Sequence, residues 1–327
     1  MKPIIPFALL GALFAVGVAG AAVTKPVGYE TITLDPGKFN LVGVRLFEAP
    51  VASGVFESST ATTLVDDDAS FSLVAATTYV IEFENGAVFT APGSDFSGTT
   101  ISNLTGVTAA LESSYIVREA STIASVFGAS NETGLAASPN ADPTEADIIL
   151  VPSDTGFTRV FYSTFTSDPA FAGWLDADSF EQASGVVILP SDGFFVQTAV
   201  SAAPIDLVVT GEVKTTPTAF VAESDFSLLS SVYPAGATLE NSGLSAFVQA
   251  SANADPTEAD VVLLPVSGGF TRAFFSTFTS DPAFAGWLDA DSFEQVPDRD
   301  LTPGYFIQKI GPDINGVAST PSFYSTL

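Results

Sequence analysis

Hydrophobic positions along the chain fall in short runs, several of them alternating with polar positions, and turn-forming residues separate the runs. Residues 28–34 (GYETITL) alternate as a half-buried strand does, Asp35-Pro36-Gly37 is a turn signal, and 39–47 (FNLVGVRLF) follows as a second strand. Ser and Thr fill most polar positions of these runs, as on a strand with one buried and one hydroxylated face. The pattern predicts an all-β protein with few short helices.

One long stretch of the chain is written twice. Residues 163–182 (STFTSDPAFAGWLDADSFEQ) recur letter for letter at 276–295, and the block NADPTEAD occurs at 140–147 and again at 253–260 with the same spacing. The repeat predicts two tandem β-hairpin-rich modules, 23–200 and 218–327, joined by a connector at 201–217. The first module is longer, which predicts a small β barrel or sheet inserted at about 51–119.

The apolar runs also predict the elements of these modules. Within the repeated block we expect two hairpins, 148–151 with 157–166 and 186–189 with 194–200, and their copies at 261–264 with 270–279 and up to 305–308. In the insertion we expect strands at 70–74, 79–83, 87–90, 100–104 and 115–118. Residues 121–128 predict one short helix, with Ser121 as its N-cap and Gly128 after its end. Asp142, Pro143 and Glu145 match a capping box.

The N-terminus is typical of a secretory signal peptide, residues 1–22. Lys2 supplies the positive start, 4–18 the apolar run, and Ala19-Gly20-Ala21 a small-residue cleavage site. A retained membrane anchor is the alternative, since 3–23 carries no charge and is long enough to span a bilayer. We expect a secreted protein, extracellular or on the cell surface, with the periplasm as a further possibility and no membrane span after cleavage.

Composition narrows the chemistry. The chain has no Cys and no His, which excludes disulfides, thiolate nucleophiles, imidazole ligands and every His-based triad. The net charge of −27 repels phosphate, so nucleic acid is not an expected partner. Such acidity serves solubility in a salty medium, or it supplies carboxylates that bind Ca²⁺.

Two sets of residues are candidate sites. Closely spaced carboxylates offer hard oxygen ligands for Ca²⁺, although they equally suit a polar turn; they are Asp176, Asp178 and Glu181, with the copies Asp289, Asp291 and Glu294. Paired aromatic side chains would stack on sugar rings if exposed and would fill the core if buried; they are Phe171 and Trp174, with the copies Phe284 and Trp287.

Several short motifs together resemble a family of secreted bacterial proteins, typical of the Verrucomicrobia, that are built from repeated β modules. They are FNLVGVRLF, TIASVFG followed by NETGL, ADIILVP with FTRVFYS, the pair Gly173-Trp174, and VVILPSDGFFVQ. The resemblance implies secretion and tandem β modules, and it implies no catalytic residue.

These observations predict a non-catalytic secreted or cell-surface protein with a structural or adhesive role. Its expected partners are an extracellular glycan, Ca²⁺ or other surface proteins. The alternative is a carboxylate-dependent extracellular hydrolase of the glycosidase type, because paired carboxylates can perform that acid–base chemistry. A pocket with two facing carboxylates would favour the hydrolase, and a flat aromatic face would favour the glycan-binding protein.

Overall fold

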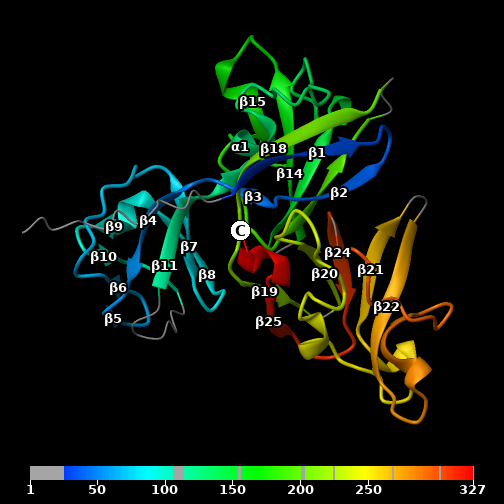
Figure 1. The fold of residues 1–327 in the computed structure, drawn as a ribbon. Helices are drawn as coiled ribbons and strands as arrows, with labels where there is room; N and C mark the ends of the chain where they lie inside the picture. The colour runs from blue at the N-terminus through cyan, green and yellow to red at the C-terminus, as the bar shows by residue number, and fades with distance from the viewer. Residues whose placement is uncertain are drawn as a thin grey trace, which may run out of the picture.

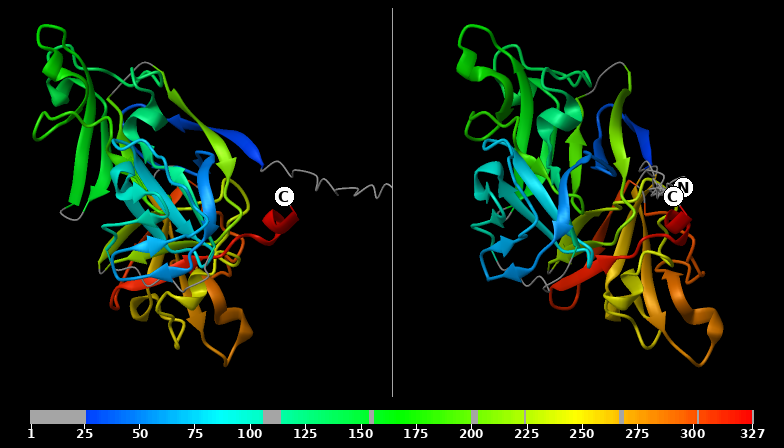
Figure 2. Two further views of the ribbon diagram at one scale, coloured as in Figure 1. Left: turned by 90° about the vertical axis from the view of Figure 1, so that its left-hand side faces the viewer. Right: turned by 60° about the vertical axis from the view of Figure 1, so that its left-hand side comes forward.

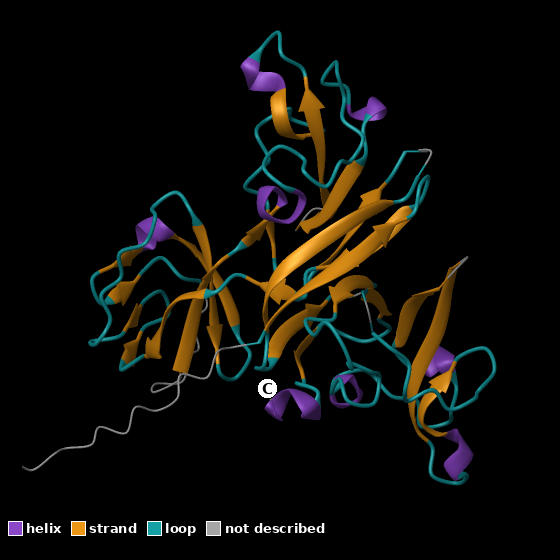
Figure 3. Ribbon diagram, turned by 45° about the horizontal axis from the view of Figure 1, so that its top comes forward, coloured by secondary structure: helices purple, strands orange, loops and turns teal. Residues whose placement is uncertain are grey.

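A computed structural model describes residues 26–105, 114–153, 156–199, 203–223, 225–266, 269–301 and 303–326 of the chain. Strands dominate these residues, and their helical elements are α1 (Ile123–Phe127) and short 3-10 turns. Figure 3 shows the strands in orange and the helical turns in purple. The predicted all-β fold is confirmed. The expected signal peptide, residues 1–22, lies outside the described residues.

The first large sheet has five antiparallel strands in the order β15-β14-β13-β17-β2. Three of its strands begin and end within the repeated stretch 140–182, and a fourth follows that stretch. The fifth comes from the chain before the predicted insertion. Their bounds are β2 (Phe39–Gly43), β13 (Ile148–Ser153), β14 (Gly156–Thr164), β15 (Ala172–Asp176) and β17 (Gly193–Gln197). This sheet lies in the upper part of Figure 1.

The second large sheet repeats the order of the first, β23-β22-β21-β24-β20. Its strands are β20 (Phe226–Ser230), β21 (Val261–Val266), β22 (Gly269–Thr277), β23 (Ala285–Asp289) and β24 (Gly304–Gln308), at the lower right of Figure 1. The register is also repeated: Tyr162 faces Trp174 in one sheet, and Phe275 faces Trp287 in the other. The two copies of the repeat therefore adopt the same strand register.

A further strand pair accompanies each large sheet. β1 (Val27–Leu34) pairs along its whole length with β18 (Ile205–Val213), which pairs on its other side with β3 (Leu46–Phe47). β19 (Thr218–Ala222) pairs with β25 (Ile314–Ala318). Along the chain, β1 comes before β2 and β18 comes after β17; in the same way, β19 comes before β20 and β25 comes after β24. Each large sheet is therefore flanked in sequence by two strands that pair with each other.

The segment expected as an insertion forms two four-stranded sheets around a core of its own. One sheet has the order β4-β11-β7-β8, with β4 (Pro50–Val55), β7 (Thr78–Phe83), β8 (Val88–Pro92) and β11 (Ser114–Glu119). The other has the order β5-β6-β10-β9, with β5 (Ser58–Ser59), β6 (Leu64–Val65), β9 (Phe96–Ser97) and β10 (Thr100–Ile101). These strands are blue to cyan in Figures 1 and 2, and the turn between β7 and β8 contacts β19, where Ala219 N donates to Gly86 O. The predicted domain boundaries stay predictions.

Three predicted elements are wrong. Residues 186–189 do not form a hairpin with 194–200, because both edges of β17 are taken by β13 and β2, and β16 (Val187–Ile188) pairs instead with β12 (Ser121–Thr122). Residues 70–74 form no strand and contribute one isolated bridge, Phe71 to Gly98. The expected strand at 39–47 breaks after Gly43 into β2 and β3.

The predicted helix caps also change. Thr122, not Ser121, is the N-cap of α1, and its Oγ1 accepts from Ser125 N at 3.2 Å. Asp142 caps a single 3-10 turn, Pro143–Glu145, but no capping box forms. The Glu145 carboxylate accepts from Asn140 Nδ2 at 3.0 Å instead of reaching back to the Asp142 backbone.

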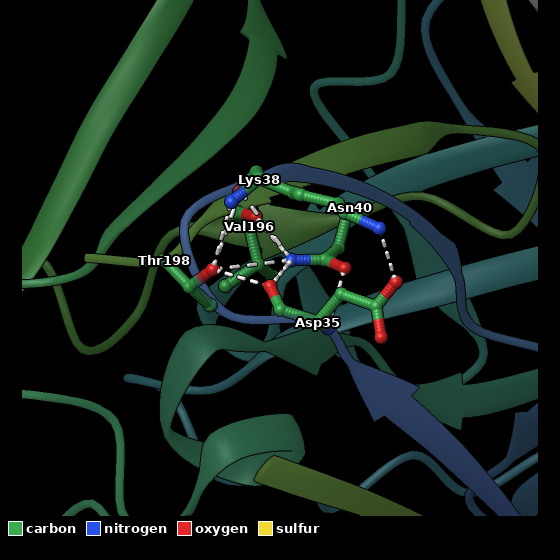
Figure 4. A network of polar contacts seen from close by, with 5 residues as sticks. All are labelled: Asp35, Lys38, Asn40, Val196 and Thr198. Atoms are coloured by element: carbon green, nitrogen blue, oxygen red, sulfur yellow. Dashed lines mark hydrogen bonds and ion pairs between the residues drawn. The ribbon is translucent and has the colours of Figure 1, made fainter. Parts of the chain in front are cut away.

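The turn between β1 and β2 is tied to β17, the strand next to β2 in the first large sheet, and to the residue after its end. Asn40 Nδ2 donates to Asp35 O at 3.1 Å and to Val196 O at 3.2 Å, and Thr198 Oγ1 donates to Asp35 O at 2.6 Å (Figure 4). Lys38 Nζ lies 2.8 Å from Asp35 Oδ2 at the surface. These bonds fix β2 as the last strand of its sheet, and that edge of the sheet meets the second module.

The two large sheets meet where β2 and β17 approach β20. Asp192 bridges to Leu229, and Ser230 N donates to Ser191 O at 2.8 Å. Glycine permits the approach: a Cβ added at Gly193 would lie 2.8 Å from Leu229 O, and one at Gly43 would overlap Ser230 Oγ. The sheets therefore form one junction through close backbone contact.

Candidate functional site

Both predicted tryptophans lie inside the protein. Trp174 and Trp287 are each 1% exposed and belong to the cores beneath the two large sheets. Trp174 Nε1 donates to Gly128 O at 2.8 Å, which ties the ring to the end of α1. A side chain with this little exposure offers no face to a sugar, so the prediction of Phe–Trp stacking platforms is wrong and the core alternative holds.

The phenylalanine of each predicted pair remains at the surface. Phe171 and Phe284 are each 37% exposed. Phe171 contacts Phe180, with ring centroids 6.5 Å apart. Phe180 and its copy Phe293 have positive φ angles of 60° and 62°, which are strained for a bulky side chain. We call the turns that carry them, 177–180 and 290–293, the repeated turns.

The predicted calcium ligands do not converge. Asp176 Oδ1 accepts from the backbone N–H groups of Asp178 and Ser179, at 2.9 and 2.7 Å, and so closes the repeated turn. Asp178 pairs with Arg159 at 3.0 Å. The residues that the structure describes hold no group of three or more Asp and Glu side chains that suits a metal ion. The proposed ligand sets, which also include Glu181, Asp291 and Glu294, are therefore wrong as calcium sites.

The second copy adds a cation to the same turn. Asp289 Oδ1 accepts from Asp291 N and Ser292 N, and its Oδ2 lies 2.5 Å from Arg299 Nη2. Burial opposes ionisation, but these hydrogen bonds and the Arg299 charge outweigh it and lower the pKa of Asp289 to about 2. The carboxylate is thus a structural group that holds its turn.

A contiguous row of phenylalanines crosses the junction between the two large sheets. Phe39 and Phe226 are 61% and 59% exposed, Phe157 and Phe270 are 43% and 46% exposed, and all four lie at equivalent places in the two sheets. Two half-buried rings, on β17 and β24, complete the row. We call this set the aromatic strip: Phe39, Phe157, Phe195, Phe226, Phe270 and Phe306.

Ring contacts link five of the six members of the strip, and Phe226 lies on the same face of the second sheet as Phe306. Phe195 contacts Phe39 and Phe157, with centroids 6.1 and 6.2 Å apart, and Phe306 contacts Phe270 at 5.5 Å. Phe195 and Phe306 contact each other at 5.7 Å and so join the two sheets. The four most exposed rings present roughly 400 Å² of apolar surface, since an aromatic side chain offers about 150–250 Å². A patch of that size on a soluble protein commonly marks a binding site.

The strip was missed at the sequence level, although a signal exists. Successive side chains of a strand point to opposite faces, so Phe194-Phe195 and Tyr305-Phe306 each place one aromatic ring on either face. Phe194 and Tyr305 fill the cores, and Phe195 and Phe306 therefore lie on the outer face. Two adjacent aromatics at the same place in both copies predict an aromatic outer surface.

A cavity of about 480 Å³ lies between β4, β7 and β11 of the inserted segment and Thr216, and Glu82 and Glu84 both line it. Glu82 Oε2 is 2.9 Å from Lys214 Nζ and 3.6 Å from Arg118 Nε, and these three side chains are almost fully buried. Burial lowers the pKa of Lys214, and the Glu82 charge opposes that shift. Glu84 accepts from Ser114 Oγ at 2.8 Å. The buried ion cluster links β7 and β11 to the chain after β18.

Comparison of the chain with protein-family models, with curated proteins and with solved structures gave no match. Among the helices of the described part of the chain, none has the length and apolar character needed to cross a membrane.

Proposed function

We propose that the protein is a secreted, non-catalytic adhesion protein of the cell surface or extracellular matrix, and that it attaches through the aromatic strip. The observation that carries the proposal is the strip itself, which places six phenylalanines from both copies on one outer surface. Secretion rests on the signal-peptide pattern of residues 1–22 and on the resemblance to secreted proteins of repeated β modules.

Exposed phenylalanine works against solubility unless a partner covers it. Each ring left in water forfeits the free energy of burial, roughly 25 cal/mol per Å² of apolar surface. The strands that carry the strip also bury phenylalanine, tyrosine and valine on their inner faces, so the outer rings are not needed to fill a core. A role in binding accounts for their place at equivalent positions of two modules.

The alternative function, a carboxylate-dependent hydrolase, is favoured by one observation, the two glutamates of the cavity. A glycosidase needs one carboxyl group that carries a proton for the leaving group and one that is ionised. Glu82 has Lys214 at 2.9 Å and Arg118 at 3.6 Å, so its carboxylate is engaged in a buried ion cluster that links two parts of the chain. This arrangement supports the non-catalytic proposal.

The proposal is tested by incubating the purified mature chain with envelopes and matrix of the cells that produce it. We expect the chain to sediment with this material and to release no soluble sugar from it. Release of sugar that is lost in Glu82→Gln and Glu84→Gln variants would instead establish the hydrolase. A chain that neither sediments nor releases sugar would contradict both functions.

A further inference from the structure

We infer that the aromatic strip binds an uncharged polysaccharide chain laid across the junction of the two large sheets. The inference rests on the proposed function of the strip as the attachment surface and names its ligand. Four properties of the strip support it: its lack of charge, its size, its neighbouring amide groups and its twofold repetition.

The strip is an uncharged area on a strongly acidic protein. Its members are all phenylalanines, and their direct cross-strand partners are Leu41, Leu150, Pro152, Gln197 and the equivalent residues of the second sheet. The nearest charged side chains on these strands, Arg159 and Arg272, are each paired with an aspartate, Asp178 and Asp291. The whole chain carries −27. An acidic polymer or an anionic lipid surface would be repelled, and a cationic partner would find no charge within the strip to pair with. Charge complementarity therefore selects an uncharged ligand.

The size of the strip argues for a slender ligand. A stable protein–protein interface buries about 800 Å² on each partner, about twice what the exposed rings present. A second copy of the chain would also bring a second net charge of −27 to the contact. A single polymer chain needs only a narrow contact, which a row of rings linked at 5.5 to 6.2 Å provides.

Amide groups lie beside the most exposed rings. Gln197 faces Phe39 across the first sheet, and Gln308 faces Phe226 across the second. Within the described residues, no side-chain hydrogen bond occupies either amide. An amide is both donor and acceptor, as a sugar hydroxyl is, while the C–H face of a sugar ring is apolar. Rings and amides side by side thus match both surfaces of a neutral sugar.

The twofold repetition matches a polymer of repeating units. Phe39, Gln197 and Phe157 have the same arrangement as Phe226, Gln308 and Phe270, and Phe195 and Phe306 join the two sets. Two equivalent half-sites on one surface bind a repeating chain more tightly than either would alone, because the second contact is intramolecular.

The test is affinity electrophoresis of the mature chain in native gels that contain soluble β-glucan, mannan or xylan, with alginate as the acidic comparison. We expect at least one neutral polysaccharide to retard the chain and alginate to leave it unretarded. In Phe39→Ala with Phe226→Ala we expect the apparent Kd to rise about tenfold, the change that corresponds to about 1.4 kcal/mol. Because both rings are exposed, we expect the variant to fold, and thermal melting checks that it does.

The matched control is Phe171→Ala with Phe284→Ala, which removes equally repeated, exposed rings outside the strip and should leave retardation unchanged. No retardation by any neutral polysaccharide, equal retardation of the strip variant, or retardation only by alginate would each overturn the inference. If the strip variant still loses attachment to the producing cells' envelopes, the adhesive function stands and the ligand is an apolar protein segment. If the strip variant attaches to the envelopes as the wild type does, the proposed function is contradicted together with the polysaccharide inference.

Discussion

Phe195 and Phe306 occupy the same position in the two modules and contact each other across the junction, with ring centroids 5.7 Å apart and planes inclined by 34°. Each is the outward-facing half of an aromatic pair whose other member fills the core of its own module. One contact between equivalent residues therefore makes two separate aromatic clusters into a single strip. The junction that brings these rings together decides whether the strip exists.

The junction depends on glycine at position 43. An added Cβ would overlap Ser230 Oγ and lie 2.6 Å from Pro303 O. We expect Gly43→Ala to destabilise the protein by about 1–3 kcal/mol, the usual cost of overpacking. Gly185→Ala, where an added Cβ meets nothing within 4 Å, is the control. Chemical denaturation measures both, and equal midpoints for the two variants would contradict the close approach of the sheets.

The repeated turns store backbone strain at Phe180 and Phe293. An Ala at both positions keeps the positive φ without the ring, whereas a Gly removes the strain as well. The Gly double variant should therefore be more stable than the Ala double variant, by about 1–2 kcal/mol for each turn. Thermal melting of the two variants measures the difference. Equal melting temperatures for the two double variants would contradict strain in these turns.

Calcium should have no specific effect on stability. The Asp176 carboxylate accepts hydrogen bonds from backbone N–H groups, and the Asp178 carboxylate forms an ion pair with Arg159. Because the chain carries −27, any salt should raise the melting temperature by screening self-repulsion. We expect CaCl₂ and NaCl of equal ionic strength to raise it equally, with and without Asp178→Asn and Asp291→Asn. A larger rise in CaCl₂ that these substitutions abolish would restore the calcium site.

Asp192 should make stability depend on pH. Burial at the junction raises its pKa from the ordinary 3.8 to about 6, so the folded state favours the protonated carboxyl. Its contribution is full below the ordinary pKa and is lost as the pH rises through about 6. Asp192→Asn should therefore stabilise the protein by about 1–3 kcal/mol near neutral pH and should remove this dependence. Denaturation of both proteins across this pH interval measures the difference in stability; parallel curves would contradict the partly buried position of Asp192 at the junction.

Much of the fold could be predicted because it is local. Apolar runs and turn residues predict β13, β14 and β21, and the letter-for-letter repetition of residues 163–182 indicates that β15 recurs as β23. The pairing of β17 with β2 and β13 could not be predicted in this way, because it joins strands that are far apart in the chain. A period-two pattern assigns a strand to a face but leaves its neighbours open.

The candidate site shows the same limit. Sequence spacing placed Trp174 beside Phe171, but the strand turns Trp174 inward and the preceding 3-10 turn leaves Phe171 outside. Asp176 and Asp178 are close in sequence, yet one closes a turn and the other pairs with Arg159. The strip draws on six strands that are scattered along the chain, so only the folded structure brings its rings together.

The most direct test of the account is the affinity of the mature chain for envelopes of the producing cells, measured for the wild type and two double variants. Phe195→Ala with Phe306→Ala removes the central contact of the strip, and Phe171→Ala with Phe284→Ala removes exposed rings elsewhere. We expect the first to weaken attachment by about tenfold or more and the second to leave it unchanged, with both variants folded. Equal attachment of all three proteins would contradict the strip as the adhesive surface.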